Sequence, residues 1–201
     1  MNKRFSAVVL AAGESARVGC NKLELTLGGR SVLEHVIDHF LIDSVIEIVV
    51  VTGKFSSELQ FKNISPLIRF VHNPNYAQGM GSSVKKGIES LSIIPDAFFI
   101  TPADMPAIRK ETIHNMAETF KDHNIVIPTY QGKKGHPVLL DKIFIEQCLN
   151  EKKEKVLYEV IEKNKNRIDF IPVEDEGILM DIDRMEDYEK LKKYYNDPLN
   201  K

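Results

Sequence analysis

Short runs of apolar residues alternate with segments of helical periodicity along the first part of this 201-residue chain. Continuously apolar runs, rather than alternating ones, are typical of parallel strands that helices cover on both faces. Strands that are connected through helices form βαβ units with right-handed crossovers. We therefore predict an α/β fold of three layers with a mostly parallel central sheet. The predicted strands are residues 5–11, 45–51, 67–71, 97–100 and 124–128.

Helical periodicity marks the segments between and after these strands. In 31–41 the apolar residues fall on one face of a helix, and Ser31 precedes them as a cap. In 81–91 the pattern is similar, with Ser82 or Ser83 as the cap. The remaining chain predicts a strand at 135–140, helices at 142–149 and 155–163, a strand at 167–173 and a helix at 185–195.

Composition narrows the classes of function. The formal net charge is −2, and this near-neutral balance argues against a general nucleic-acid or anionic-membrane binder. No run approaches the roughly 20 apolar residues of a membrane span, and the basic start lacks the apolar core of a secretory signal. The two cysteines, Cys20 and Cys148, form no CxxC pair. We expect a cytoplasmic protein with one domain over residues 1–201, and we interpret the charge run NEKKEK at 150–155 as a solvated helix face.

The first strand runs directly into a loop with the sequence AAGESARVGCNK. In open parallel sheets, ligands bind beyond the carboxyl ends of the strands. Gly13 and Gly19 permit close approach of the backbone to an anion, while Arg17 and Lys22 supply a planar and a compact cation. This combination suits a polyphosphate, although the spacing matches neither a P-loop nor the GxGxxG fingerprint. The alternative is an ordinary strand-to-helix turn with surface charges.

Carboxylates follow two later apolar runs. Asp104 follows the fourth strand in FFITPADMP, where it is placed to hold Mg²⁺, or else to cap a helix near 110 or form an Asx-turn. Asp181 and Asp183 follow GILM, which we predict as another strand. Strand alternation points both side chains the same way, so one is a candidate second metal ligand. The alternative for Asp183 is a cap of the last helix.

Five segments together resemble the MobA-like nucleotidyltransferase family. LAAGESARVGCNK resembles its LAAGxSxRMGxxK signature, and NPNYAQGMGSSVKKGI resembles its N…GMxxSxxxG segment. PADMP is similar to its ADxP metal motif, GKKGHPVLL to its GHPVLL stretch, and DIDRMEDY to its DIDTPEDY end. The matches occur in family order from residue 10 to 188. The resemblance implies a Rossmann-like fold that binds a nucleoside triphosphate.

The resemblance also implies a reaction, in which a phosphate of the acceptor attacks the α-phosphorus in line and pyrophosphate leaves, with Mg²⁺ as the cofactor. By family match, Arg17, Lys22 and Asp104 are the catalytic residues, and Asp104 and Asp183 hold the metal. His136 and Asp181 would lie on the acceptor side. The implied nucleotide-binding residues are Leu10, Ala11, Ala12, Gly13, Lys22, Gly79, Ser82 and Ser83.

Within the family, LAAG accompanies cytidylyl transfer and LAGG guanylyl transfer, so Ala12 favours CTP over GTP. The implied acceptor is the molybdenum cofactor, with a molybdenum hydroxylase as a downstream partner. Two departures concern the rest of the site: DRMED replaces DTPED around Asp183, and LNEKKEKVLYEVI (149–161) replaces the GDxGxR-type acceptor loop.

Three alternatives remain open from the sequence. The same chemistry would serve a sugar phosphate, phosphocholine or an isoprenoid precursor as the acceptor. A nucleotide-binding protein that delivers cofactor without turnover would need neither a clamp for the leaving group nor a metal site. An NAD-dependent oxidoreductase is disfavoured because GxGxxG is absent.

Overall fold

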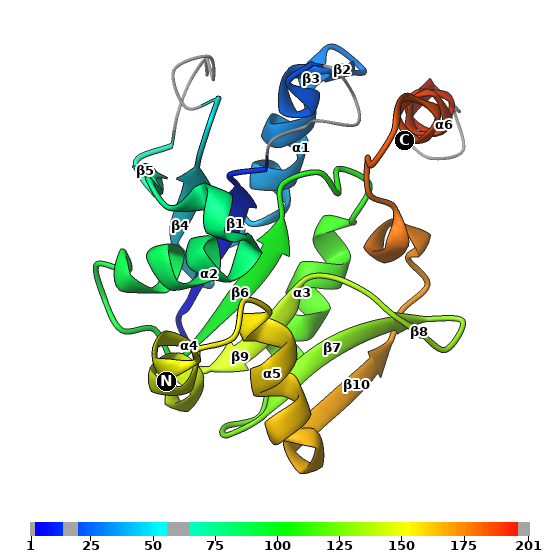
Figure 1. Ribbon diagram of the computed structural model, residues 1–201. Coiled ribbons are helices and arrows are strands. Elements are labelled where there is room, and N and C mark those ends of the chain that lie inside the picture. Colours follow the sequence, from blue (N-terminus) through cyan, green and yellow to red (C-terminus); the bar gives the residue numbers. More distant parts are fainter. Residues whose placement is uncertain (1–2, 14–19, 56–64, 197–201) are drawn as a thin grey trace.

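A central sheet forms the middle layer of the protein, which is described here by a computed structural model over residues 3–13, 20–55 and 65–196 (Figure 1). Its strands are β1 (Phe5–Ala11), β4 (Val45–Thr52), β5 (Ile68–His72), β6 (Ala97–Pro102), β7 (Ile125–Tyr130), β8 (Lys133–Lys134), β9 (Val138–Asp141) and β10 (Ile168–Pro172). The order across the sheet is β10–β7–β9–β6–β1–β4–β5, with β8 paired to β7. A separate hairpin joins β2 (Thr26–Leu27) to β3 (Arg30–Ser31).

Most neighbouring strands run parallel, as the sequence predicts. β1 pairs in parallel with β4 and β6, β4 with β5, and β7 with β10. Within the described residues, β9 and the short β8 are the strands that run against their neighbours in this sheet. The strand predicted at 135–140 is therefore an antiparallel insertion between β6 and β7. The carboxyl ends of the parallel strands collect at one edge of the sheet.

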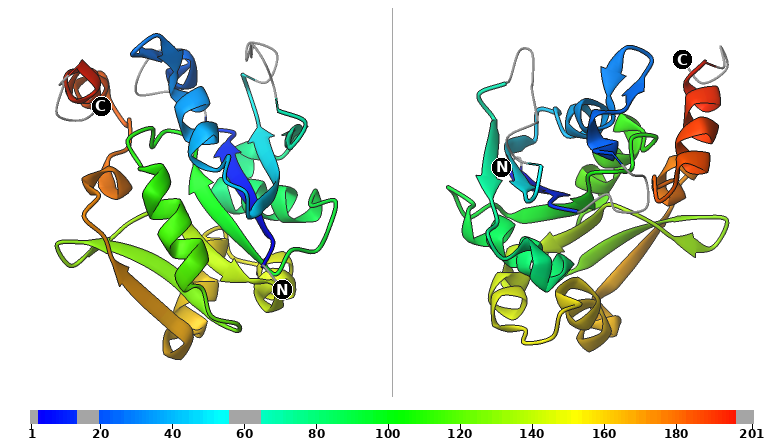
Figure 2. Two further views of the ribbon diagram at one scale, coloured as in Figure 1. Left: turned by 180° about the vertical axis from the view of Figure 1, so that it is seen from behind. Right: turned by 45° about the horizontal axis from the view of Figure 1, so that its top comes forward.

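Helices cover both faces of the sheet (Figure 2). One face packs against α1 (Val32–His39) and α3 (Lys110–Thr119), and the other against α2 (Met80–Glu89), α4 (Ile145–Asn150) and α5 (Val156–Lys163). α6 (Met185–Asn196) lies beside the β2–β3 hairpin. No helix of the described residues combines the length and the apolar character that crossing a membrane requires. The 3₁₀ turns are η1 (Lys22–Glu24), η2 (Tyr76–Gln78), η3 (Lys142–Phe144), η4 (Lys165–Arg167) and η5 (Glu176–Leu179).

The two faces have separate hydrophobic cores, which explains why β1 is apolar throughout. Ala7 and Val9 point into the core under α1 and α3, whereas Val8 points into the core under α2 and α5. All three side chains are fully buried. A strand that is buried on both faces cannot alternate polar and apolar residues, so the continuous run follows from the three-layer architecture.

The two predicted helix caps have different outcomes. Ser31 caps α1 in a complete capping box, in which its hydroxyl accepts the N–H of Glu34 and the Glu34 carboxylate accepts the N–H of Ser31. The prediction of a Ser82 or Ser83 cap is wrong, because α2 begins earlier, at Met80, and its N-cap is Gly79. Gly79 has a φ of 97°, a left-handed conformation that a residue without Cβ adopts at little cost.

The strand predicted at GILM is also wrong, since residues 176–179 form the 3₁₀ turn η5. Asp175 causes the turn: one carboxylate oxygen accepts the N–H of Gly177, and the other accepts the N–H of Arg109 and the hydroxyl of Thr112. A Cβ on Gly177 would lie 1.9 Å from the carbonyl oxygen of Ala107. These contacts fasten the segment to the start of α3 instead of to a neighbouring strand.

The charge run at 150–155 is likewise not a helix face. Residues 151–155 form the loop between α4 and α5, and Glu151 within it is only 7% exposed. Buried carboxylates require partners, so this run has a structural role that its composition did not indicate.

Candidate active site

A pocket of about 430 Å³ opens at the carboxyl edge of the sheet. We call it the strand-edge pocket, and its volume lies within the usual range for small-molecule sites. The end of β1, the turn η1, the start of α2, the residues after β6 and the residues before α6 all contribute to it. Its lining comprises Leu10, Ala11, Ala12, Gly13, Lys22, Leu23, Tyr76, Ala77, Gly79, Met80, Ser83, Pro102, Ala103, Asp104 and Asp183.

An ion pair between Lys22 and Asp104 lies at one side of the strand-edge pocket. Lys22 Nζ donates to Asp104 Oδ2 and, at 2.6 Å, to the carbonyl oxygen of Ile182. The two charged side chains are only 14% and 16% exposed, respectively. Asn21 holds the lysine in place by capping η1 through the N–H of Leu23. Three segments that are distant in the sequence therefore meet at one partly desolvated charge pair.

The second carboxylate oxygen of Asp104 is available to a ligand. Asp104 Oδ1 is buried and accepts no hydrogen bond from the described residues. A buried carboxylate oxygen without a donor is costly, and a bound cation removes that cost. Asp104 does not cap α3, because the N-cap is Arg109 and the carboxylate there belongs to Asp175.

Asp183 contributes a second carboxylate to the same pocket. The N–H of the adjacent Ile182 donates to the carbonyl oxygen of Asp104 at 3.1 Å, which ties the two acidic segments together. At the start of α6, the Asp187 carboxylate accepts the N–H groups of Asp183 and Arg184. The described residues contain no cluster of three or more side chains of the kind that forms a complete metal cage. Two carboxylates nevertheless suit Mg²⁺, which usually completes its coordination with phosphate oxygens and water.

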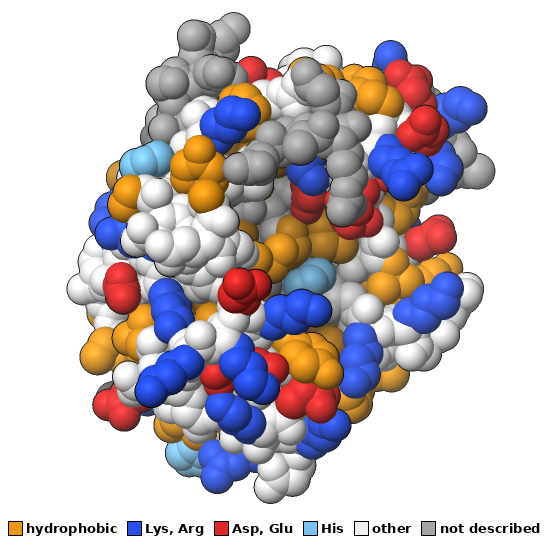
Figure 3. All heavy atoms as spheres, viewed as in Figure 1, with side chains coloured by type: hydrophobic (Ala, Val, Ile, Leu, Met, Phe, Trp, Pro, Cys, Tyr) orange, Lys and Arg blue, Asp and Glu red, His pale blue; other side chains and the backbone are white. Residues whose placement is uncertain are grey.

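A second pocket, of about 650 Å³, shares Gly79 and Met80 with the first. We call it the α2–α5 pocket. In the space-filling view this face is hollowed, with hydrophobic side chains on the floor of the hollow and lysines along its lower rim (Figure 3). The rest of its lining comprises Gly81, Val84, Ile127, Lys134, Gly135, His136, Val138, Glu154, Lys155, Val156, Leu157, Tyr158, Ile161 and Glu162.

His136 and Asp181 are both influenced by the Asp104 carboxylate. Burial lowers the pKa of the His136 imidazole, and the negative charge of Asp104 opposes this effect. Burial raises the pKa of the Asp181 carboxyl, and the nearby charge of Asp104 adds to it. His136 lines the α2–α5 pocket. Its ring nitrogen Nδ1 is buried and has no hydrogen-bond partner among the described residues.

The sequence of residues 7–168 matches the MobA-like NTP transferase domain. The chain belongs to this family.

Individual relatives agree with this membership. The chain is 27% identical over 195 residues to the molybdenum cofactor cytidylyltransferase of Escherichia coli strain K12, covering 96% of this chain and 98% of that one. It is 26% identical over 217 residues to a probable molybdenum cofactor guanylyltransferase of Carboxydothermus hydrogenoformans, with the same coverage. We conclude that the protein is a nucleotidyltransferase of the MobA-like family.

Solved structures share the fold. A nucleotidyl transferase from Methanothermobacter superposes with a TM-score of 0.82 at 21% identity, over 96% of this chain and 98% of that one. A Mycobacterium tuberculosis protein, solved in complex with manganese, has a TM-score of 0.76 at 16% identity, over 96% and 100% of the two chains. Both similarities extend over nearly the whole length of this chain.

Most of the predicted site residues of this MobA-like protein gather in one place. Leu10, Ala11, Ala12, Gly13, Lys22, Gly79, Ser83, Asp104 and Asp183 all line the strand-edge pocket. Ser82 instead faces a separate surface depression beside Lys85 and Lys86. Asp181 lines neither pocket of the described residues, and Arg17 lies outside the residues that the structure describes.

Sequence reasoning missed Asn73, which organises the start of α2. This side chain is 2% exposed; its amide nitrogen donates to the hydroxyls of Ser82 and Ser83, and its oxygen accepts the N–H of Asn75. Asn73 thereby fixes the turn that presents Gly79 to the pocket. A signal was present, because Asn73 opens the segment NPNYAQGMGSSVKKGI on which part of the family resemblance rests.

Proposed function

We propose that the protein transfers a cytidylyl group from CTP to the phosphate of the molybdenum cofactor, releases pyrophosphate and requires Mg²⁺. The observation that carries this proposal is the Lys22–Asp104 pair, with a buried and unpartnered carboxylate oxygen, at the carboxyl edge of the sheet. The two molybdenum cofactor transferases among the relatives support the choice of acceptor. The whole chain, residues 1–201, acts as one domain in this proposal, and a molybdenum hydroxylase would receive the product.

The residues of the chain have distinct roles in this reaction. Lys22 places a positive charge beside the triphosphate, in a setting where low exposure strengthens electrostatic attraction. Asp104 and Asp183 would hold Mg²⁺, and the family match adds Arg17 as a second cation on the leaving group. When bound, the metal ion would neutralise charge that develops on the phosphates during displacement.

The nucleotide is positioned by backbone and by small side chains. Gly13 leaves room for a ligand, since a Cβ built on it would have no neighbouring atom within 4 Å. The first turn of α2, which begins at Met80, borders the strand-edge pocket and brings the positive end of the helix dipole to it. Fixing both reactants in this way supplies much of the rate enhancement of phosphoryl-type transfers.

The preference for CTP rests on Ala12. This residue lines the strand-edge pocket and is only 9% exposed, so its methyl group narrows the space for a base. The two relatives transfer different nucleotides yet are almost equally similar to this chain, so overall identity does not discriminate between CTP and GTP. A pocket that is smaller by one methyl group changes discrimination by about 10–200-fold.

The same site would also serve cytidylyl transfer to a sugar phosphate, phosphocholine or an isoprenoid precursor. A pure nucleotide-binding carrier is less well supported, because it would need neither Lys22 nor a metal-binding carboxylate beside the nucleotide.

Turnover with a panel of nucleotides tests this proposal directly. The protein is mixed with Mg²⁺, molybdenum cofactor and CTP, GTP, ATP or UTP, and released pyrophosphate is measured. We expect turnover with CTP and measurable GTP turnover after Ala12→Gly. Turnover with an alternative acceptor but not with the molybdenum cofactor would reject the acceptor, and an unchanged nucleotide preference in Ala12→Gly would reject the role of Ala12.

A further inference from the structure

We propose that Asp187, on the first turn of α6, is a positioning residue that determines how tightly the site binds its divalent cation, because it fixes the backbone of Asp183. Two tyrosines of the same helix hold the segments that carry Lys22 and Asp104. This inference rests on the proposed function, in which Asp104 and Asp183 hold Mg²⁺. It adds the element of the fold that sets the relative positions of the two carboxylates.

Both candidate metal ligands lie outside regular secondary structure. Asp104 follows the end of β6, and Asp183 lies between the turn η5 and α6. The N–H of Ile182 joins the two segments by donating to the carbonyl oxygen of Asp104 at 3.1 Å. Ile182 is fully buried in the core under α1 and α3, whereas Asp183 is exposed. Burial therefore anchors residue 182 but not the metal-binding residue that follows it.

Asp187 supplies a further contact to Asp183. Its atom Oδ2 accepts the N–H of Asp183 at 3.2 Å and the N–H of Arg184 at 2.9 Å. A capping box needs only the second of these bonds, in which the side chain at the third helical position accepts the N–H of the residue before the helix. The additional bond goes to the candidate metal ligand itself, and capping of α6 does not account for it.

The sequence at the start of α6 increases the importance of Asp187. Arg184, which precedes the helix, has no side-chain acceptor and cannot cap the first turn as Ser31 caps α1. Met185, at the first helical position, lacks the fixed φ that a proline would supply there. The conformation of residues 183 and 184 therefore depends more on the Asp187 carboxylate than it would with a side-chain cap and a proline.

Tyr188 connects α6 to the segment that carries Lys22. Its hydroxyl donates to the carbonyl oxygen of Thr26 at 2.8 Å, two residues beyond the turn η1 that begins at Lys22. Tyr188 is only 7% exposed, and α6 lies beside the β2–β3 hairpin in the views of Figure 2. The residue next to Asp187 thus fixes the distance between α6 and the lysine segment.

Tyr195 connects α6 to the segment that carries Asp104. Its hydroxyl donates to the carbonyl oxygen of Pro106, two residues after Asp104. Its ring packs on His35 of α1, with the ring centroids 4.6 Å apart. One helix therefore contacts all three segments that carry the charged residues of the proposed reaction, and a shift of this helix would change their spacing. Preorganised ligands bind a cation more tightly because less ordering is needed on binding.

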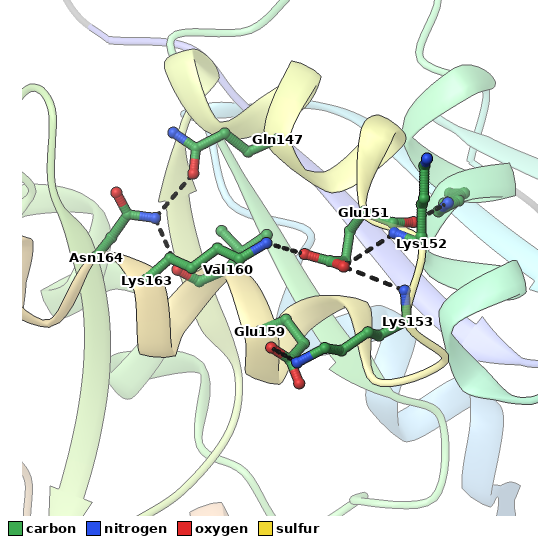
Figure 4. Close-up of polar contacts among 9 residues, drawn as sticks. Gln147, Glu151, Lys152, Lys153, Glu159, Val160, Lys163 and Asn164 are labelled. Atoms are coloured by element: carbon green, nitrogen blue, oxygen red, sulfur yellow. Dashed lines mark hydrogen bonds and ion pairs between the residues drawn. The ribbon is translucent and has the colours of Figure 1, made fainter.

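Glu151 is a carboxylate with similar bonds but no binding site beside it (Figure 4). It accepts the N–H groups of Lys152 and Lys153 at 2.9 and 3.1 Å and also Lys163 Nζ. Among the described residues, those of this loop between α4 and α5 do not line the strand-edge pocket. Glu151 therefore holds a loop only, which makes it a structural control for Asp187.

Binding of Mn²⁺, measured by electron paramagnetic resonance without any turnover, tests the inference. We expect saturable binding to the wild-type protein and at least tenfold weaker binding to Asp187→Ala. Asp187→Asn retains an oxygen that accepts the two N–H groups, so its affinity should fall less than threefold. Equal losses in the two variants would overturn the inference, because the charge of Asp187, and not its hydrogen bonds, would then set the affinity.

Three further variants extend the test. Glu186→Ala removes an exposed carboxylate from the same turn, and Glu151→Gln weakens the fold at a distance from the pocket; both should bind Mn²⁺ like the wild type. Tyr195→Phe removes only the hydroxyl that holds residue 106, and we expect about threefold weaker binding. Circular dichroism checks each fold, and Tyr195→Phe decides the question if Asp187→Ala does not fold. Wild-type affinity in Tyr195→Phe, or in a folded Asp187→Ala, would overturn the inference.

Turnover with CTP is measured separately, which distinguishes two failures. Turnover by the wild type, together with equal Mn²⁺ affinities of the wild type and Asp187→Ala, rejects the positioning role alone. Mn²⁺ binding that depends on Asp187, in a protein without nucleotidyl transfer, rejects the proposed function and retains the role of Asp187 in cation binding. A wild-type protein that binds no Mn²⁺ and has no turnover rejects both.

Discussion

Two carboxylates with little exposure each pair with a lysine, yet their surroundings differ in one respect. Glu151 has both oxygens engaged by the protein, through two backbone N–H groups and Lys163. Asp104 engages Lys22 through one oxygen and leaves the other buried without a donor among the described residues. A fully satisfied carboxylate stabilises the fold, whereas a half-satisfied one keeps a coordination position for a ligand. In the proposed function, this difference separates a structural ion pair from one that takes part in the reaction.

The largest expected effect is the loss of activity when Asp104, the carboxylate with one unpartnered oxygen, is replaced. Asp104→Asn keeps the shape of the side chain but removes its charge, so we expect turnover to fall about a thousandfold, or roughly 4 kcal/mol in the barrier. Pyrophosphate release measures this loss, and circular dichroism checks the fold.

Asp96 provides a matched control at the opposite end of the same strand. It pairs with Lys142 on the surface, far from the site along β6, so Asp96→Asn should retain wild-type turnover. Wild-type turnover in Asp104→Asn as well would remove Asp104 from the mechanism.

The second effect concerns the loop that Glu151 holds. Gly81→Ala forces a Cβ against Glu154, so we expect an overpacking cost of about 1–3 kcal/mol in the free energy of unfolding. Urea unfolding measures this cost. Lys86→Ala on the same helix is the control and should unfold like the wild type. Equal stability of Gly81→Ala and the wild type would contradict the prediction, because it would show that the loop moves away without cost.

The pH dependence of stability sharpens the contrast. Hydrogen bonds from Lys163 and from the N–H of Lys153 lower the pKa of Glu151 from its ordinary value of 4.5 to about 2. The ionised form is therefore favoured by folding, and its contribution is complete above pH 4.5 and is lost as the pH falls through 2. Glu151→Gln should be less stable than wild type near neutral pH, and the difference should shrink between pH 4.5 and 2. Thermal melts over that range measure it, and a pH-independent difference would contradict the assignment.

The smallest expected effect on stability is that of replacing Lys163, the exposed lysine that pairs with Glu151. Lys163 is 59% exposed, so solvent screens its pairing with Glu151. Lys163→Met should lower the melting temperature by about 2 °C or less. A much larger decrease in melting temperature would mean that Lys163, and not the two backbone N–H groups, contributes most of the stabilisation of the loop at residues 151–155.

Sequence patterns anticipated the parts of the structure that local chemistry determines. Ala12, Lys22 and Asp104 could be assigned to one edge because each closely follows a parallel strand or its loop, and the structure brings them into one pocket. The alternation of strands and helices was confirmed for the same reason, since burial on both faces dictates a continuously apolar strand.

Elements that depend on distant partners escaped prediction. The 3₁₀ turn at GILM requires Asp175 to bond to Arg109 and Thr112, which are 66 and 63 residues away. Glu151 looked like a solvated charge until Lys85 and Lys163 were placed beside it. Short sequence windows contain no information about such pairings between distant residues.

The contact from Lys22 to the carbonyl oxygen of Ile182 joins residues 160 positions apart. During synthesis the amino-terminal strands and the loop after β1 leave the ribosome long before this carbonyl exists. The strand-edge pocket is therefore completed only after residues 182 and 183 have been translated. A nascent chain that ends before Ile182 would lack the carbonyl oxygen to which Lys22 donates. It would also lack the carboxylate of Asp183. Competence to bind nucleotide should consequently arise only after this segment has been synthesised.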